Sequence, residues 1–151
     1  MVSKNERYTA VGTTCQDILE CMSEALIFAD PQGIIRIWNP GAEYLFGYTA
    51  DEAVGQNLNL IIPEHLRDAH WQGFHRAISQ GSTAHGRTSS ITRSLHKAGK
   101  QLYVDMSFAV VRNQAGETIG ATAVARDATE RYLEEKRLRQ QLAALTAKPS
   151  K

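Results

Sequence analysis

The sequence has no excess of charge of one sign, few cysteines and no long apolar run, and each absence excludes a class of protein. Its 151 residues carry 17 lysines and arginines against 16 aspartates and glutamates, so the formal net charge is +1. Such a balance lacks the concentrated basic surface that binds nucleic acid phosphates. No apolar run approaches the roughly 18 residues that span a bilayer, and residues 1–14 lack the apolar stretch of a secretory signal. We therefore expect no nucleic acid and no membrane as partner.

The two cysteines, Cys15 and Cys21, form neither a CxxC motif nor a zinc-ribbon pattern. This usage predicts buried thiols in a reducing compartment, and hence a cytoplasmic protein. The length corresponds to one domain with room for flanking helices, and a hydrophobic fraction of 42% is enough for a core that needs no disulfide or structural metal.

Turn residues and hydrophobic spacing divide the chain into predicted helices and strands. The predicted elements are, in chain order, a helix over 8–22, strands over 25–30 and 34–39, short helices after Pro40 and Thr49, a helix from Glu64 to Ser79, strands over 86–95, 101–112 and 118–126, and a helix over 129–145. This order predicts an α+β fold with a five-stranded antiparallel sheet and helices on one face. We place a central domain at 23–128, between flanking segments at 1–22 and 129–151.

Both flanking helices carry an apolar seam. Residues Tyr8, Val11, Cys15, Ile18 and Met22 recur at spacings of three and four, as do Leu138, Leu142 and Leu145 near the other end. The first seam fits packing on its own domain as well as pairing with a second chain, since it covers only about two heptads. Together the seams predict a homodimer formed through the terminal helices.

Motifs of common enzymes are missing. The sequence contains no GxSxG, no GxxxxGK[ST] and no HExxH, and its acidic residues form no pair that periodicity would bring together in a cleft. We therefore expect a protein that is not an enzyme.

Five histidines remain as candidate ligands, and three of them lie in the 64–79 helix. His65, His70 and His75 follow one another at intervals of five, or about 140° around the axis, so they cannot share a face as a zinc site requires. Only His70 lies in the apolar stripe of this helix, which comprises Leu66, Ala69, Gly73, Phe74, Ala77 and Ile78. It is either a core histidine bonded to a backbone carbonyl or an axial ligand to haem iron. The small residues Gly73 and Ala77 beside it would leave room for a flat cofactor.

Between Ile18 and Arg131 the sequence resembles a PAS domain. The residues that carry the resemblance are Asp30-Pro31-Gln32-Gly33, Trp38-Asn39-Pro40-Gly41-Ala42-Glu43, Leu45-Phe46-Gly47-Tyr48, Glu52-Ala53-Val54-Gly55, Gly99 and Val124-Ala125-Arg126-Asp127-Ala128-Thr129. The resemblance implies the PAS fold and a sensory module that passes a signal through its terminal helices to a neighbouring effector. It also implies a small ligand, or a gas, bound in the core.

Within that family the sequence is most similar to the haem-binding oxygen-sensor branch. The reactive cysteine of the blue-light flavin branch is replaced by Leu58, which excludes its photoadduct. His70 falls where the haem branch has its proximal histidine, which implies b-type haem for redox or gas sensing. The same resemblance places Arg76 near a haem propionate. It also implies that four residues line the pocket, namely Phe74, Ile78, Met106 and Phe108.

One departure from the haem branch concerns the distal side. Where that branch has an arginine that holds oxygen, ungapped counting places Ser90, with Arg87 and Arg93 three residues away on either side. Met106, or less favourably His85, then becomes the candidate sixth ligand, although a methionine commonly fills gaps in a core. The alternative is a PAS dimerisation module without cofactor that binds a small apolar ligand or a protein partner.

Overall fold

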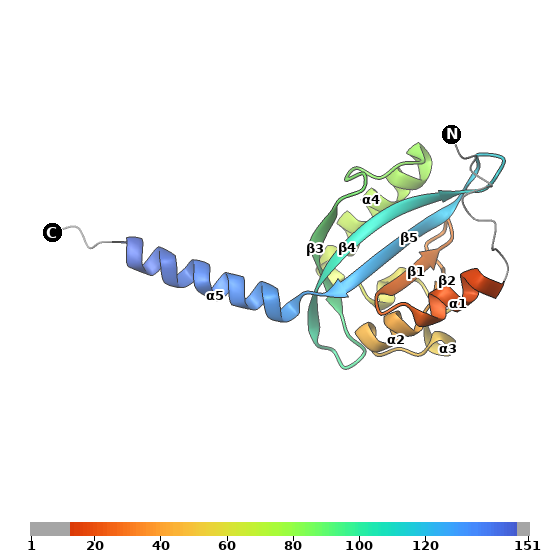
Figure 1. The fold of residues 1–151 in the computed structure, drawn as a ribbon. Helices are drawn as coiled ribbons and strands as arrows, with labels where there is room; N and C mark the ends of the chain where they lie inside the picture. Colours follow the sequence, from red (N-terminus) through yellow and green to blue (C-terminus); the bar gives the residue numbers. More distant parts are fainter. Residues whose placement is uncertain (1–12, 148–151) are drawn as a thin grey trace, which may run out of the picture.

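The computed structural model describes residues 13–147 and shows one five-stranded sheet, a set of helices packed on it, and a last helix that extends away from the rest (Figure 1). The elements are α1 (Thr13–Cys21), β1 (Ala25–Ala29), β2 (Ile35–Trp38), α2 (Pro40–Phe46), α3 (Ala50–Ala53), the 3-10 turns η2 (Leu58–Leu60) and η3 (Glu64–Leu66), α4 (Arg67–Gln80), β3 (Ser89–Leu95), β4 (Gln101–Arg112), β5 (Thr118–Asp127) and α5 (Thr129–Thr146). None of the helices described is both long enough and apolar enough to cross a membrane.

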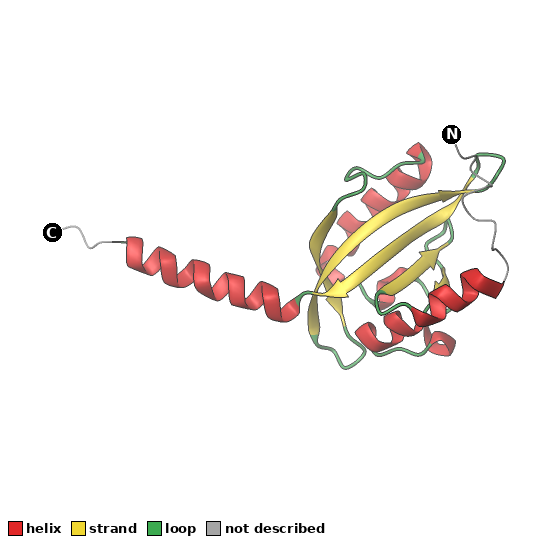
Figure 2. Ribbon diagram, viewed as in Figure 1, coloured by secondary structure: helices red, strands yellow, loops and turns green. Residues whose placement is uncertain are grey.

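The strands form an antiparallel sheet in the order β2-β1-β5-β4-β3 (Figure 2). The sequence-based prediction of an α+β fold with this sheet is therefore confirmed. The bounds of β4 agree with the prediction, whereas β3 begins three residues later than expected, at Ser89. The β1–β5 pairing brings the start of the domain beside its end, so both flanking helices leave from neighbouring strands.

Local sequence signals explain the short helices that cover one face of the sheet. Asn39 caps α2, and Thr49 with Glu52 forms the predicted capping box of α3. These helices contribute Ala42, Phe46 and other apolar residues to a core shared with the inward side chains of the strands.

Asn39 also joins three parts of the fold. Its side-chain oxygen accepts hydrogen bonds from the backbone N–H groups of Leu26 and Ala42, at 2.7 and 3.0 Å. Its amide nitrogen donates to the carbonyl oxygens of Leu19 and Glu24, at 3.2 and 3.0 Å. All four hydrogen-bonding positions of one buried side chain are thereby satisfied, which ties α1, β1 and α2 together.

The first flanking helix does not fulfil one prediction. Cys15 and Cys21 are exposed on α1, not buried, because among the described residues of this segment before Ser23 only Leu19 and Met22 are partly buried against the domain. Ile18, which lies between the two cysteines in the sequence, is 55% exposed. Tyr8 and Val11, which extend the predicted seam, lie outside the described residues.

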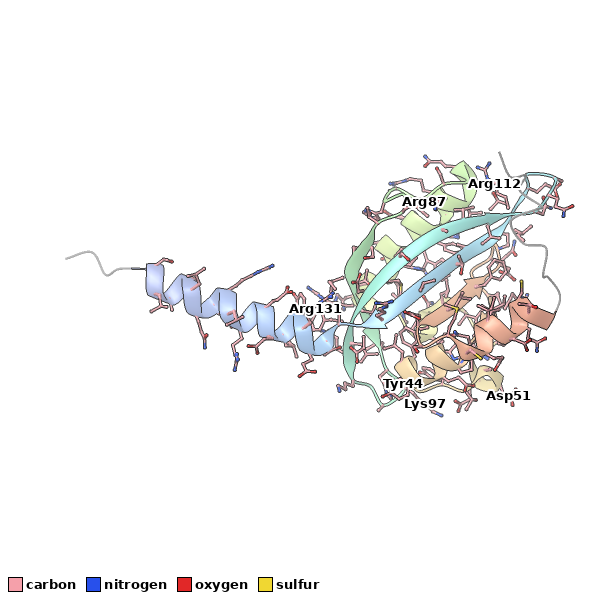
Figure 3. All side chains as sticks on the ribbon, in the orientation of Figure 1. Tyr44, Asp51, Arg87, Lys97, Arg112 and Arg131 are labelled. Atoms are coloured by element: carbon pink, nitrogen blue, oxygen red, sulfur yellow. The ribbon has the colours of Figure 1, made fainter. Side chains whose placement is uncertain are left out.

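Among residues 13–147, the contacts that hold the last helix lie at its first turns. Thr129 Oγ1 accepts a hydrogen bond from the backbone N–H of Tyr103 at 3.0 Å, and Arg131 pairs with Asp105 at 3.2 Å. Arg131 marks this junction in Figure 3, at the opposite end of the sheet from Arg87 and Arg112. Leu138, Leu142 and Leu145 of the predicted seam lie farther out on α5 and are exposed.

Candidate functional site

A cavity of about 490 Å³ lies between α4 and the sheet. Its size falls within the usual range for small-molecule sites, about 300–1,000 Å³. Its walls are mainly apolar, with Ile27 from β1, Met106 and Phe108 from β4, and Ala123 from β5 among the lining residues. The cavity is therefore suited to a ligand with a large apolar surface.

His70 is the imidazole that α4 turns toward this cavity. The ring is partly buried, and its Nδ1 atom is buried without a hydrogen-bond partner. Burial of the ring lowers the pKa of His70 to about 4, with a smaller contribution from the nearby His75. The imidazole is therefore neutral near pH 7, which is the form that binds metals.

An unpartnered buried nitrogen is uncommon and asks for an explanation. Of the two alternatives that the sequence left open, a core histidine bonded to a backbone carbonyl does not match this geometry, because Nδ1 has no such bond. Within residues 13–147 no three or more metal-ligating side chains gather in one place. A metal at His70 would thus have to bring its other ligands with it, as the iron of a haem does.

The aromatic neighbours of His70 come from its own helix. The Phe74 ring lies 6.0 Å from the His70 ring in a stacked arrangement, and the Trp71 ring meets it edge-on at 4.9 Å. Phe74 lines the cavity, while the Trp71 indole packs against the core and its Nε1 donates to Asn59 Oδ1 at 2.8 Å.

This orientation of α4 corrects the predicted apolar stripe. The predicted stripe does not include Trp71, and it places Gly73 and Ala77 beside the cofactor. In the structure Leu66, Ala69, His70 and Phe74 line the cavity as the stripe predicts, whereas Gly73 is exposed and neither Gly73 nor Ala77 lines it. The Trp71 indole packs against the core, so the face of α4 toward the domain extends beyond the predicted stripe on the Trp71 side.

The structure gathers only some of the residues that the haem resemblance implied. His70, Phe74, Met106 and Phe108 line the same cavity. Ile78 is partly buried but is not among the lining residues, and Arg76 is exposed on the outer side of α4. The lining role expected of Ile78 is therefore wrong.

The distal candidates separate according to strand register. Ser90 pairs with Met106, so it lies on the same face of the sheet as Met106, but it is exposed and does not line the cavity. Arg93 pairs with Tyr103, so its side chain starts from the opposite face, although Arg93 is among the residues that line the cavity at the β3 edge. His85 and Arg87 are exposed in the loop before β3, and neither lines the cavity.

Sequence reasoning missed part of the sheet side of the cavity. Ile27 and Ala29 of β1, and Ala121 and Ala123 of β5, also line it. The small residues at alternate positions of these two paired strands were a readable signal, because they mark a face with space in front of it.

Comparisons with known proteins agree with this architecture. A family model described as PAS fold matches residues 15–128. Sensor protein FixL of Bradyrhizobium diazoefficiens is 41% identical over 58 residues, which are 38% of this chain and 12% of FixL. Oxygen sensor protein DosP of Escherichia coli is 30% identical over 114 residues, which are 74% of this chain and 14% of DosP. The chain thus spans about one seventh or less of the length of these relatives.

A solved structure of an RNA-binding light-oxygen-voltage receptor superposes with a TM-score of 0.70 at 25% identity. The match covers 91% of this chain and 38% of that receptor. Neighbours with this fold therefore include a light receptor as well as an oxygen sensor, so the ligand of the cavity must be argued from its own residues.

Proposed function

Because the chain belongs to the PAS-fold family, we propose that it is a sensory module whose cavity holds haem b, with His70 as the proximal ligand. The observation that carries this proposal is the neutral His70 imidazole, with its unpartnered buried Nδ1, in the wall of a largely apolar cavity of about 490 Å³. A haem bound there would supply an iron able to take up a diatomic gas or to change oxidation state.

Other residues of the cavity fit a flat macrocycle. Phe74, stacked beside His70, and Phe108 across the cavity offer aromatic surface to it. Met106, buried in β4 on the sheet side, is the residue that we assign to the sixth position of the iron. The exposed Arg76, two residues beyond Phe74 on α4, is assigned to a propionate at the solvent edge.

The names of two relatives support the proposal that the chain senses a gas or a redox change. DosP is named an oxygen sensor and FixL a sensor protein, and the matched part of each is similar to this chain. The flavin photoadduct of the light-sensing branch is disfavoured, because Leu58 occupies its cysteine position. Ser90 occupies the position of the oxygen-holding arginine but does not line the cavity, and the side chain of Arg93 starts from the other face of β3, so we assign gas or redox sensing without a distal arginine.

One observation favours a second candidate, a module without cofactor that binds a small apolar molecule or a protein partner. A metal-bound histidine almost always donates its other ring N–H to a carbonyl, carboxylate or water. If iron were bound through Nε2, His70 Nδ1 would have no such partner among the residues described. A small apolar ligand would need no bond from this ring, only the apolar walls.

We assign transmission of the signal to the terminal helices. The exposed apolar residues of α5, Leu138, Leu142 and Leu145, fit a helical seam with a second copy of the chain, and Ile18 of α1 is exposed as well. A homodimer formed in this way would carry the signal to a downstream signalling protein, which we do not assign further.

The experiment that tests this function is reconstitution with haemin followed by gel filtration. We expect the protein fraction to keep a Soret band. In His70→Gly the band should be lost and should return when free imidazole is added, because imidazole can enter the space left by the side chain. A wild-type fraction without haem would reject this function and leave the cofactor-free candidate.

A further inference from the structure

Two adjacent residues of α4, His70 and Trp71, do different things in the structure. His70 lines the cavity, whereas the Trp71 indole packs against the hydrophobic core and bonds to another element. No residue of α4 is fully buried, so few side chains hold this helix in place. The bonds that do hold it therefore decide where His70 points.

The ends of α4 are fixed through backbone groups. Near the first turn, Arg67 Nε donates to the carbonyl of Ile62 at 3.2 Å and its Nη2 to that of Asn59 at 3.3 Å. At the last turn, Arg112 Nη2 donates to the carbonyl of Gly81 at 2.7 Å. Bonds at the two ends limit the position of the helix more than its rotation about its own axis.

Trp71, the residue next to His70, is bonded and packed in a way that opposes rotation of α4 about its axis. Its Nε1 donates to Asn59 Oδ1 at 2.8 Å, and Asn59 is in turn held by its own N–H, which donates to Asn57 Oδ1 at 2.8 Å. The far edge of the indole lies on Gly33, in the β1–β2 turn. A Cβ at that position would come within 2.2 Å of Trp71 Cη2, so the seat exists only because residue 33 has no side chain.

Consecutive residues of an α-helix are about 100° apart around the axis. A rotation that lifts Trp71 off Gly33 therefore swings His70 by the same angle out of the cavity wall. The two rings also touch, edge-on at 4.9 Å between centroids, which opposes independent movement of the imidazole.

We propose that Trp71, seated on Gly33 and bonded to Asn59, is the positioning residue that aims the His70 imidazole into the cavity. Its effect on an iron rests on the proposed haem function, but its effect on the direction of the ring does not. Gly33 belongs to the β1–β2 turn and Asn59 to η2, so two segments of the domain jointly set one side chain.

The test compares Trp71→Phe and Asn59→Ala with a matched control, Trp38→Phe. Trp38 also donates one indole hydrogen bond, from Nε1 to the carbonyl of Tyr48 at 3.0 Å, but it lies in β2 and does not line the cavity. The control therefore removes the same chemical group and reports the general cost of losing an indole bond.

The first readout uses the haem-free protein. Carbon-13 relaxation of the His70 ring, measured at one neutral pH, should show a lower order parameter in Trp71→Phe and Asn59→Ala than in wild type, and no change in Trp38→Phe. The second readout is the rate at which bound haem is lost to a haem-scavenging protein. It should rise by about 10-fold or more in the first two variants, the range in which support of a metal ligand is usually felt.

The outcomes separate this proposal from the one on which it rests. If wild type takes up no haem, the haem function fails, while the ring relaxation still decides whether Trp71 positions His70. If the order parameter of His70 stays at its wild-type value in both Trp71→Phe and Asn59→Ala, the positioning role is overturned. Equal loss of order in Trp38→Phe would also overturn it, because it would show only a general loosening.

Discussion

The rings of Tyr103 and Tyr132 stack with their centroids 4.0 Å apart and their planes inclined by 19°. Tyr103 belongs to β4 and Tyr132 to the second turn of α5, so this contact joins the sheet to the helix that leaves it. Along β4, residues of this outer face alternate with the inward side chains of Val104 and Met106, and Met106 lines the cavity. The stack therefore links a strand that lines the cavity to the base of α5.

Tyr132→Ala should loosen this base. An aromatic pair contributes about 0.5–1.5 kcal/mol beyond the area that it buries, so we expect only a small loss in the free energy of unfolding but a broader range of α5 directions. Spin-label distances between α5 and the sheet, measured by pulsed electron resonance, report that range. The matched control is Tyr44→Ala, because Tyr44 is 92% exposed. Equal distance distributions in the two variants would show that the stack does not fix α5.

Asn39→Ala should destabilise the fold far more than removal of an ordinary cap. It deletes four hydrogen bonds and leaves the Leu26 N–H without its partner, so we expect a loss of about 2–4 kcal/mol in the free energy of unfolding. Asn57→Ala, which removes a cap with one bond to the Asn59 N–H, should lose about 1 kcal/mol. Urea unfolding of both variants checks this. A similar loss in the two would contradict the role of Asn39 as the joint of α1, β1 and α2.

Much of the fold could be predicted because its signals are local. The capping box of Thr49 and Glu52, the end of α4 at Gly81 and the bounds of β4 each depend on neighbouring residues of the chain. The existence of an inward histidine on α4 was predictable for the same reason, from spacing on one helix.

The rest of the site depends on contacts between distant segments. The rotation of α4 is set by Trp71 against Asn59 and Gly33, which no helical periodicity contains. In this orientation of α4, Gly73 is exposed and lies outside the apolar face on which it was expected. The exposure of Cys15 likewise follows from how α1 meets the domain, on one narrow side only.

The haem-free protein should lose stability between pH 6.5 and 4 because of His70. Its folded-state pKa is lowered to about 4 from the ordinary value of 6.5. Between these values the His70 imidazole is protonated in the unfolded chain but neutral in the folded chain. The contribution is complete above pH 6.5 and is lost as the pH falls toward 4. It amounts to about 2 kcal/mol after allowance for the part of the ring that solvent screens.

Urea unfolding at a series of pH values measures this effect as a difference between proteins. His70→Phe should be flatter than wild type over this pH range. His75→Gln, at an exposed position, should depart from wild type only slightly, because His75 makes the smaller contribution to the lowered pKa of His70. Carboxylates that titrate at lower pH act alike in all three proteins and cancel. A His70→Phe curve parallel to that of wild type would show that His70 is not buried as a neutral ring.

Leu142→Asp should separate the proposed homodimer. Leu142 is 63% exposed in the middle of the seam with Leu138 and Leu145, and a carboxylate there could not be buried against a partner helix. We expect wild type to sediment as a dimer at micromolar concentration and the variant as a monomer. Gln140→Asp, on the same helix but outside the seam, adds the same charge and should leave the dimer intact. A wild-type monomer would contradict pairing through these helices.

A visible absorption spectrum tests most directly whether His70 binds haem. Wild type, His70→Ala and His75→Ala are expressed with added haem precursor, purified, and compared for Soret absorbance per protein. We expect a full band in wild type and in His75→Ala, because His75 is exposed, and loss of the band in His70→Ala. A colourless wild type, or an undiminished band in His70→Ala, would contradict it.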